Sequence, residues 1–314
     1  MHPLLGNARS VLSLGIGGGG DVVGALGVAD LVRAAGLAAR VGGVTWERRP
    51  VDPLPGPRRL DELRQARALN DHVALAGPET TGPGGFRFAE SHMARFLGEE
   101  TVLVDPHGGP QTMAAAIDDG ARQLGCDLVA LVDVGGDVLA HGHEPGLASP
   151  LCDSLLLAAA AYMTTPTVGV VFGTACDGEL TPDEVLERIA EVAAAGGLLG
   201  AHGLTPPELT RLEAAVDMVP TEASAMALRC GRGDFGRAEI RGGRRTVPLS
   251  PLGSILFFYD PAVAIASAAR LAGLVSDAAS LEEAEMRLAG LGVRSELAYE
   301  RAMAAEAGSP NDAA

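Results

Sequence analysis

The 314-residue sequence contains no lysine, because all 24 of its basic residues are arginine. This absence excludes every chemistry that needs a lysine amine, which includes Schiff-base aldolases, pyridoxal-phosphate enzymes and Walker-type ATPases. Cysteine is also scarce. The four cysteines lie at least 24 residues apart and include no C-x-x-C pair, so they indicate neither a zinc cluster nor a disulfide framework. Aromatic residues make up only 4% of the chain, and a core must therefore be built from Ala, Leu and Val.

Long apolar runs and excess positive charge are absent as well. No apolar run reaches the roughly 18–20 residues that a membrane span requires, and the first ten residues lack the segments of a signal peptide. We therefore expect a cytoplasmic protein without membrane contact. The formal net charge is −16, so binding to a long nucleic acid is not expected. A small anionic metabolite held by backbone amides is compatible with this charge, and an Ala-rich surface is compatible with a homo-oligomer.

Short apolar runs alternate with segments of helical periodicity, which predicts an α/β fold with a doubly wound, mostly parallel, Rossmann-like sheet. Uninterrupted apolar strands are typical of parallel sheets that are covered on both faces. We expect a single domain over residues 1–303 and a disordered tail over residues 304–314. Strands are expected at Ser10–Ile16, Ala38–Trp46, His72–Gly77, Thr101–Asp105, Cys126–Val134, Thr167–Gly173 and Ser254–Asp260. Helices are expected at Asp21–Gly36, at Gln111–Leu124 and after the caps Ser149, Thr181 and Thr205. Long loops are expected at Val51–Leu63 and Gly77–Phe88.

The stretch GIGGGGD, residues 15–21, lies between the first expected strand and the first expected helix. Glycines there let backbone N–H groups approach a phosphate, whose charge a helix N-terminus favours. The pattern formally matches G-x-G-x-x-G, but NAD is not the expected ligand, because Glu47 comes late for a ribose acid and Asp21 would repel a pyrophosphate. A tight turn without a ligand is the alternative. The expected ligand-binding residues here are Gly17, Gly18, Gly19, Gly20, Asp21, Glu47 and Arg48.

Two further polar loops follow apolar strands, VDVGGDVLAHGHEPGLASPLCDS at residues 132–154 and FGTACDGELT at residues 172–181. The carboxyl ends of parallel strands meet at one edge of a sheet, so all three loops are expected to face one crevice. Clustered carboxylates hold a divalent cation or raise one pKa, and oxygen ligands suit Mg²⁺ or Mn²⁺. Loop capping is the alternative for each Asp. The candidates are Asp133, Asp137 and Asp177 as catalytic residues, Gly135, Gly136, Ser149, Asp153 and Glu179 as ligand-binding residues, and Asp21, Asp133 and Asp137 as cation ligands.

Several other side chains could complete such a site. His107 and His143 are the expected proton carriers, although His143 with His141 could instead bind a transition metal. Trp46 could stack on a base or simply cover the sheet edge. Cys176 could act as a nucleophile but is more typical of a packed thiol. The expected partners of a phosphate or carboxylate are Arg48, Arg49 and Arg58.

The motifs GIGGGGDVVGAL, GGVTWER, VDVGGDVLAHGHEPGLASPLCDS and FGTACDGELT together resemble the domain of unknown function 1152 family, to Tyr259 at least. That family has no established activity, so the resemblance implies a single domain whose loops belong together and names no substrate. From the residues we expect an enzyme that binds a small phosphorylated metabolite, a nucleotide or a sugar phosphate. It would catalyse phosphoryl or glycosyl transfer or hydrolysis, assisted by carboxylates and by Mg²⁺ or Mn²⁺. A non-catalytic nucleotide sensor and a nicotinamide-dependent oxidoreductase are the alternatives.

Overall fold

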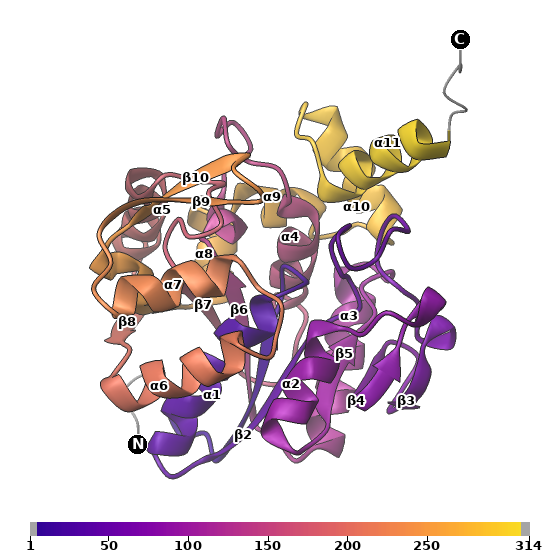
Figure 1. The fold of residues 1–314 in the computed structure, drawn as a ribbon, viewed down its shortest axis with the longest axis horizontal. Helices are drawn as coiled ribbons and strands as arrows, with labels where there is room; N and C mark the ends of the chain where they lie inside the picture. Colours follow the sequence, from indigo (N-terminus) through magenta and orange to yellow (C-terminus); the bar gives the residue numbers. More distant parts are fainter. Residues whose placement is uncertain (1–4, 309–314) are drawn as a thin grey trace.

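A nine-stranded sheet runs through the computed structural model, which describes residues 5–308 (Figure 1). The strand order is β3-β4-β5-β2-β1-β6-β7-β11-β8. The five central strands are parallel, whereas β4 and β11 run antiparallel to both of their neighbours. The strands are β1 (Ser10–Gly15), β2 (Ala38–Val44), β3 (Arg64–Ala68), β4 (Val73–Thr81), β5 (Thr101–Val104), β6 (Leu128–Val134), β7 (Thr167–Phe172), β8 (Leu198–Gly203) and β11 (Ile255–Tyr259).

Helices cover both faces of this sheet, which confirms the predicted doubly wound, mostly parallel fold. On one face α1 (Asp21–Ala34), α2 (Ala89–Leu97), α6 (Pro206–Val216) and α7 (Ala223–Gly231) share a core with the strands. The ribbon of β9 (Gly236–Ile240) and β10 (Arg245–Leu249) forms a separate small sheet and joins this core. The helices of the other face are α3 (Pro110–Gln123), α4 (Pro150–Ala159), α5 (Pro182–Ala194), α8 (Pro261–Ser267), α9 (Arg270–Val275) and α10 (Leu281–Gly290).

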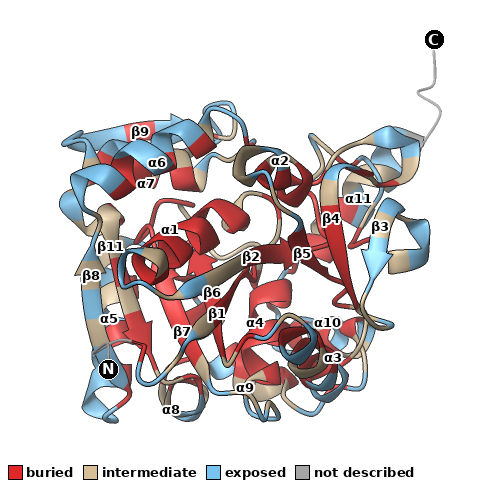
Figure 2. Ribbon diagram, turned by 90° about the horizontal axis from the view of Figure 1, so that it is seen from below, coloured by how far each residue is buried: buried red, intermediate tan, exposed pale blue. Residues whose placement is uncertain are grey.

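The core is formed by small aliphatic side chains, as the composition predicts. Helix α1 and the central strands are almost entirely buried (Figure 2). Gly24 allows this packing, because a Cβ at its position would lie 2.4 Å from Cγ2 of Val134 on β6. The expected capping boxes are present at Thr181 with Glu184 and at Thr205 with Glu208, and they fix the starts of α5 and α6.

The position of β1 defines where the polar loops meet. Strand β1 pairs with β2 on one side and with β6 on the other. The chain therefore winds outward from β1 through β2 and later returns across it to β6. Ligand crevices of open α/β sheets form at such a switch point, outside the carboxyl ends of the strands. The glycine loop after β1 and the Gly135–Gly136 turn after β6 both start at this point.

Some predicted boundaries are wrong. The expected loop Gly77–Phe88 begins as a strand, since β4 extends to Thr81. The expected disordered tail begins inside a helix, because α11 (Glu296–Gly308) includes residues 304–308; residues 309–314 lie outside the described part of the chain. Strands β3 and β8 and the β9–β10 ribbon were not expected. Within residues 5–308, no helix combines the length and the apolar character needed to cross a membrane.

Candidate functional site

Six acidic side chains gather at the ends of β1, β6 and β7, and they come from the start of α1, the end of β6, the loops after β6 and β7, and the start of α4. They form two groups, and within each group one ligand oxygen per residue lies within 4.8 Å of the others. The first group is Asp21, Asp133 and Asp153, and the second is Asp137, Asp177 and Glu179. The expected convergence of the loops is therefore present. The expected cation set is divided, because Asp137 belongs to the second group while Asp21 and Asp133 belong to the first.

The first group is held by backbone amides and by bare backbone. Asp21 accepts hydrogen bonds from the N–H groups of Gly17, at 3.0 Å, and Val134, and Asp133 accepts one from Gly136 at 2.8 Å. A Cβ at Gly17 would lie 2.6 Å from Asp21 Oδ2 and 2.9 Å from Asp153 Oδ2. Only glycine therefore lets the two carboxylates approach each other from either side of this residue.

Burial dominates the electrostatics of this first group. It raises the pKa of Asp21 to about 7, and it raises the pKa values of Asp133 and Asp153 well above their ordinary range. Nearby carboxylates add to the shift, and Arg48 opposes it at Asp21 and Asp153. Asp153 is 2% exposed, and its Oδ1 has no hydrogen-bond partner in the described chain. Such a buried oxygen is a site for a proton or a cation.

The second group combines one anchored carboxylate with two that are less satisfied. Glu179 accepts hydrogen bonds from the N–H groups of Ala148 and Ser149 and from the Ser149 hydroxyl, so it fixes the start of α4. Oδ2 of Asp137 and Oδ1 of Asp177 are buried without a hydrogen-bond partner among the described residues. Burial, together with neighbouring carboxylates, raises the pKa of Asp177 to about 7 and that of Asp137 well above its ordinary range.

The glycine loop itself is partly occupied by contacts within the protein. The N–H of Gly17 donates to Asp21, and the N–H of Gly19 donates to the carbonyl of Trp46 at 2.8 Å. Gly18 has a φ of 85°, and a Cβ there would lie 2.7 Å from that carbonyl. At Gly20 a Cβ would lie 2.3 Å from Oγ1 of Thr221. The four glycines therefore permit the chain segments around Asp21, Trp46 and Thr221 to pack closely against the loop. The amides of Gly17 and Gly19 already donate hydrogen bonds within the protein.

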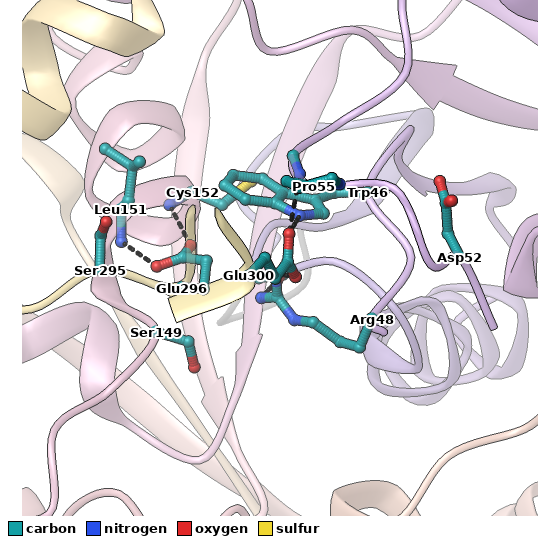
Figure 3. A network of polar contacts seen from close by, with 12 residues as sticks. Trp46, Arg48, Asp52, Pro55, Ser149, Leu151, Cys152, Ser295, Glu296 and Glu300 are labelled. Atoms are coloured by element: carbon teal, nitrogen blue, oxygen red, sulfur yellow. Dashed lines mark hydrogen bonds and ion pairs between the residues drawn. The ribbon is translucent and has the colours of Figure 1, made fainter. Parts of the chain in front are cut away.

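The side chain of Arg48 lies beside Glu300 of the C-terminal helix (Figure 3), and it also interacts electrostatically with Asp153 of the first group. Its guanidinium donates to the carbonyl of Gly17, lies 5.2 Å from the ring centroid of Trp46 and lies 4.0 Å from Glu300. Glu300 accepts a hydrogen bond from Nε1 of Trp46, and Glu296 accepts from the first amides of α4, at Leu151 and Cys152. Helix α11 thus covers this side of the site. Trp46 is fully buried, so of the two alternatives left open for it, stacking on a base is wrong.

Arg241 of the β9–β10 turn and Arg245 at the start of β10 reach the second group. Nη2 of Arg241 lies 3.4 Å from Oε1 of Glu179, and Nη1 of Arg245 donates to the carbonyl of Gly178 at 2.6 Å. Arg241 has a φ of 54°, which is a strained conformation for a residue with a side chain. Arg244 contacts the Tyr299 hydroxyl of α11 at 3.4 Å. The ribbon and α11 therefore meet over the site.

The two histidines expected to carry protons interact elsewhere. His107 pairs with Asp105 at 2.6 Å, and its carbonyl accepts from Leu281 of α10. His143 is exposed, and its ring lies 5.6 Å from that of His141. His141 contacts Arg188 at 2.8 Å. His141, His143 and Glu144 each offer one ligand atom within 4.8 Å of the others, and the guanidinium of Arg188 beside His141 opposes a cation there.

Other expected roles are also revised by burial. Arg58 is 6% exposed, pairs with Asp52 at 2.9 Å and donates to nearby carbonyl groups, so it holds its own loop. Glu47 accepts the N–H of Ala89 at the start of α2, which leaves it poorly placed to bind a ribose. Cys176 is fully buried beside Cys230, and its pKa is raised. It is a packed thiol rather than an activated nucleophile.

Sequence reasoning missed the contributions of the C-terminal half. Glu296 and Glu300 share one face of α11, and their i, i+4 spacing is the signal that could have indicated this face. Arg241 and Arg245 were not among the expected site residues, because nothing in the local sequence shows that their segment folds back over the second group. Both carboxylate oxygens of Glu90, near the start of α2, are buried without a partner in the described chain.

The comparisons with known proteins agree with the motif pattern. Residues 12–304 match the family described as "Protein of unknown function (DUF1152)". No curated protein matches the chain. No solved structure matches it either. Since the match covers nearly the whole chain, including all three loops and most of α11, this protein belongs to the DUF1152 family.

Proposed function

We propose that this protein is a divalent-cation-dependent enzyme that transfers or hydrolyses a phosphoryl group of a small phosphorylated metabolite. The observation that carries the proposal is the first group, Asp21, Asp133 and Asp153. Two buried carboxylates, Asp133 and Asp153, and the partly exposed Asp21 lie at the switch point of the sheet with raised pKa values, and Asp153 Oδ1 has no partner within residues 5–308. Oxygen-only ligands favour Mg²⁺ or Mn²⁺ over zinc.

The surrounding charges fit an anionic substrate. Arg48 lies beside the first group and Arg241 beside the second, and guanidinium groups suit phosphate oxygens. In the proposed reaction a phosphorus–oxygen bond to the acceptor forms while the bond to the leaving oxygen breaks. The leaving oxygen keeps the electron pair, and the acceptor's proton passes to a carboxylate. Glycosyl transfer is less favoured, because it gains less from a cation that neutralises phosphate charge.

Access to this site requires movement of its cover. Asp133, Asp153 and Glu179 are each no more than 2% exposed, and of the six carboxylates only Asp21 is partly exposed, so the described arrangement is nearly closed. The β9–β10 turn and α11 meet through the exposed contact of Arg244 with Tyr299, and we propose that the cover opens there. Closure over a bound phosphate would exclude water and strengthen every charge interaction within the site.

Cation binding is tested first, by thermal unfolding of the EDTA-treated protein with and without Mg²⁺ or Mn²⁺. A cation at 100 times its Kd adds about 2.7 kcal/mol, which corresponds to several degrees in Tm. The Asp153→Asn variant is expected to lose this gain. Asp217→Asn, at an exposed site, is expected to keep it. A gain that survives Asp153→Asn would contradict the assignment.

Turnover is then measured against nucleoside mono-, di- and triphosphates, inorganic diphosphate and sugar phosphates. We expect phosphate release or transfer that needs the cation and is abolished in Asp153→Asn but not in Asp217→Asn. Turnover in EDTA would overturn the proposal. Cation-dependent binding of a phosphate compound without turnover of any of them would support the nucleotide sensor instead.

A further inference from the structure

The second group of carboxylates has its own unsatisfied ligand atoms. We propose that this site holds two divalent cations side by side, one at Asp21, Asp133 and Asp153 and one at Asp137, Asp177 and Glu179. The inference rests on the proposed function and deepens it, because it assigns a second cation to the same site. Two of the second group's carboxylates are buried, since Asp137 is 5% exposed and Asp177 is 7% exposed.

The Gly135–Gly136 turn places the two groups next to each other. Asp133 precedes the turn and belongs to the first group, whereas Asp137 follows it and belongs to the second. The N–H of Gly136 donates to Asp133, and a Cβ at Gly135 would lie 2.4 Å from Cγ of Asp177. This turn therefore contacts carboxylates of both groups. Because Gly135 has no side chain, its backbone lies directly against Asp177.

Each group contains a buried carboxylate oxygen that nothing in the described chain satisfies. These atoms are Oδ1 of Asp153 in the first group and, in the second, Oδ2 of Asp137 and Oδ1 of Asp177. Leaving a charged oxygen buried without a partner is strongly unfavourable. One cation within the first group would satisfy Asp153 only. The unpartnered oxygens of Asp137 and Asp177 therefore point to a second ligand between them.

Charge leads to the same conclusion. Among the described residues, the arginines that approach the six carboxylates are Arg48, Arg241 and Arg245. Three guanidinium groups do not neutralise six carboxylates once these are ionised to bind cations, and Arg48 is also shared with Glu296 and Glu300. Two divalent cations together with a phosphate dianion would bring the closed site close to neutrality. Because Glu179 already accepts three hydrogen bonds from Ala148 and Ser149, Asp137 and Asp177 would be the principal ligands of the second cation.

The chemical consequence concerns the substrate. Two cations about 3.5–4 Å apart clamp a phosphoryl group on both its attacking and its leaving oxygen. A metabolite with a terminal phosphate or a diphosphate is the class of substrate that can bridge them. Arg241 and Arg245 lie on the side of the second cation, where they can bind the remaining phosphate oxygens.

The test uses Mn²⁺ alone with the full-length protein, by equilibrium dialysis and electron paramagnetic resonance. We expect two Mn²⁺ per chain and a spin-coupled spectrum, because the ions are close. Asp177→Asn is expected to reduce the stoichiometry to one and to restore an uncoupled spectrum. Asp137→Asn is a second variant with the same expectation, and Asp217→Asn is the control that keeps both ions.

The outcomes separate this inference from the proposed function. One Mn²⁺ per chain, lost in Asp153→Asn but retained in Asp177→Asn and Asp137→Asn, would overturn the second cation and leave the proposed enzyme standing. Two ions without coupling would overturn the adjacent arrangement. No Mn²⁺ binding to the wild-type chain would overturn both proposals. The wild-type stoichiometry and spectrum decide these points even if one variant fails to fold.

Discussion

The carboxylate of Asp177 lies directly against the backbone of Gly135. A Cβ at Gly135, where φ is 145°, would lie 2.4 Å from Cγ of Asp177 and 2.5 Å from its Oδ1. The contact joins the loop after β7 to the loop after β6. Glycine is therefore required at position 135 both for its positive φ and for the space that it leaves to a carboxylate.

Replacing Gly135 by Ala is expected to lower the free energy of unfolding by about 1–3 kcal/mol, because the new Cβ is both strained and overpacked. Mn²⁺ affinity should fall at least tenfold as Asp177 is displaced. Gly98→Ala is the matched control, since Gly98 has a φ of 70° but nothing within 4 Å of its Cβ position. It should lose stability and keep the cation. Denaturant unfolding and Mn²⁺ titration measure both quantities, and equal cation affinity in the two variants would contradict the prediction.

Two glycines of α1 should respond in opposite directions. Gly24→Ala places a Cβ 2.4 Å from Val134 Cγ2 in the packed core, which is expected to cost about 1–3 kcal/mol. At Gly27 nothing lies within 4 Å of a Cβ, so Gly27→Ala should stabilise the helix by up to about 1 kcal/mol. Urea unfolding of both variants checks the sign. A loss of stability in Gly27→Ala would show that α1 packs more tightly there than described.

The stability of the cation-free protein should fall as the pH rises. Burial raises the pKa of Glu47 to about 7 and that of Glu90 well above its ordinary value, and each of these carboxyls borders a neighbouring acid. The folded state therefore keeps protons that the unfolded chain releases between about pH 4.5 and 7. The stabilisation that comes from these protonated carboxyls is complete below pH 4.5 and is lost as the pH rises through 7. For Glu47 the difference is on the order of 3 kcal/mol.

Glu47→Gln should reduce this pH dependence while keeping an acceptor for the Ala89 amide. The measurement is urea unfolding in EDTA at pH 5 and pH 8 for the wild type, for Glu47→Gln and for the exposed control Glu282→Gln. We expect a smaller difference between the two pH values in Glu47→Gln only. An unchanged difference would show that Glu47 is ionised in the folded state.

Arg48 and Glu300 should be energetically coupled across the covering helix. Their side chains lie 4.0 Å apart, and Glu300 also accepts the Trp46 indole N–H. A double-mutant cycle with Arg48→Met and Glu300→Gln is expected to give a coupling of about 1 kcal/mol. The fluorescence of Trp46, the single tryptophan of the chain, reports whether the cover stays closed. Additive effects with unchanged fluorescence would show that α11 does not depend on Arg48.

Local chemistry determined the main elements of this protein. The alternation of apolar runs with helical periodicity predicted the α/β class, the central strands and the doubly wound arrangement, because burial on both faces leaves that pattern in the sequence. Capping boxes at Thr181 and Thr205 marked the starts of two helices. The same reasoning placed Asp21, Asp133, Asp137 and Asp177 at strand ends, since parallel strands bring their carboxyl ends to one edge.

The tertiary structure decided how those residues are combined. Which Asp faces which depends on strand order and on the turn at Gly135, and no local pattern encodes either of them. From the sequence alone, Trp46 and Arg58 could have bound a ligand. In the fold, contacts with distant segments bury Trp46, and Arg58 binds the carbonyl groups of its own loop. The covering residues Glu296 and Arg241 come from far along the chain. Sequence periodicity reports burial and local hydrogen bonding, whereas contacts across 50–250 residues arise only when the sheet has assembled.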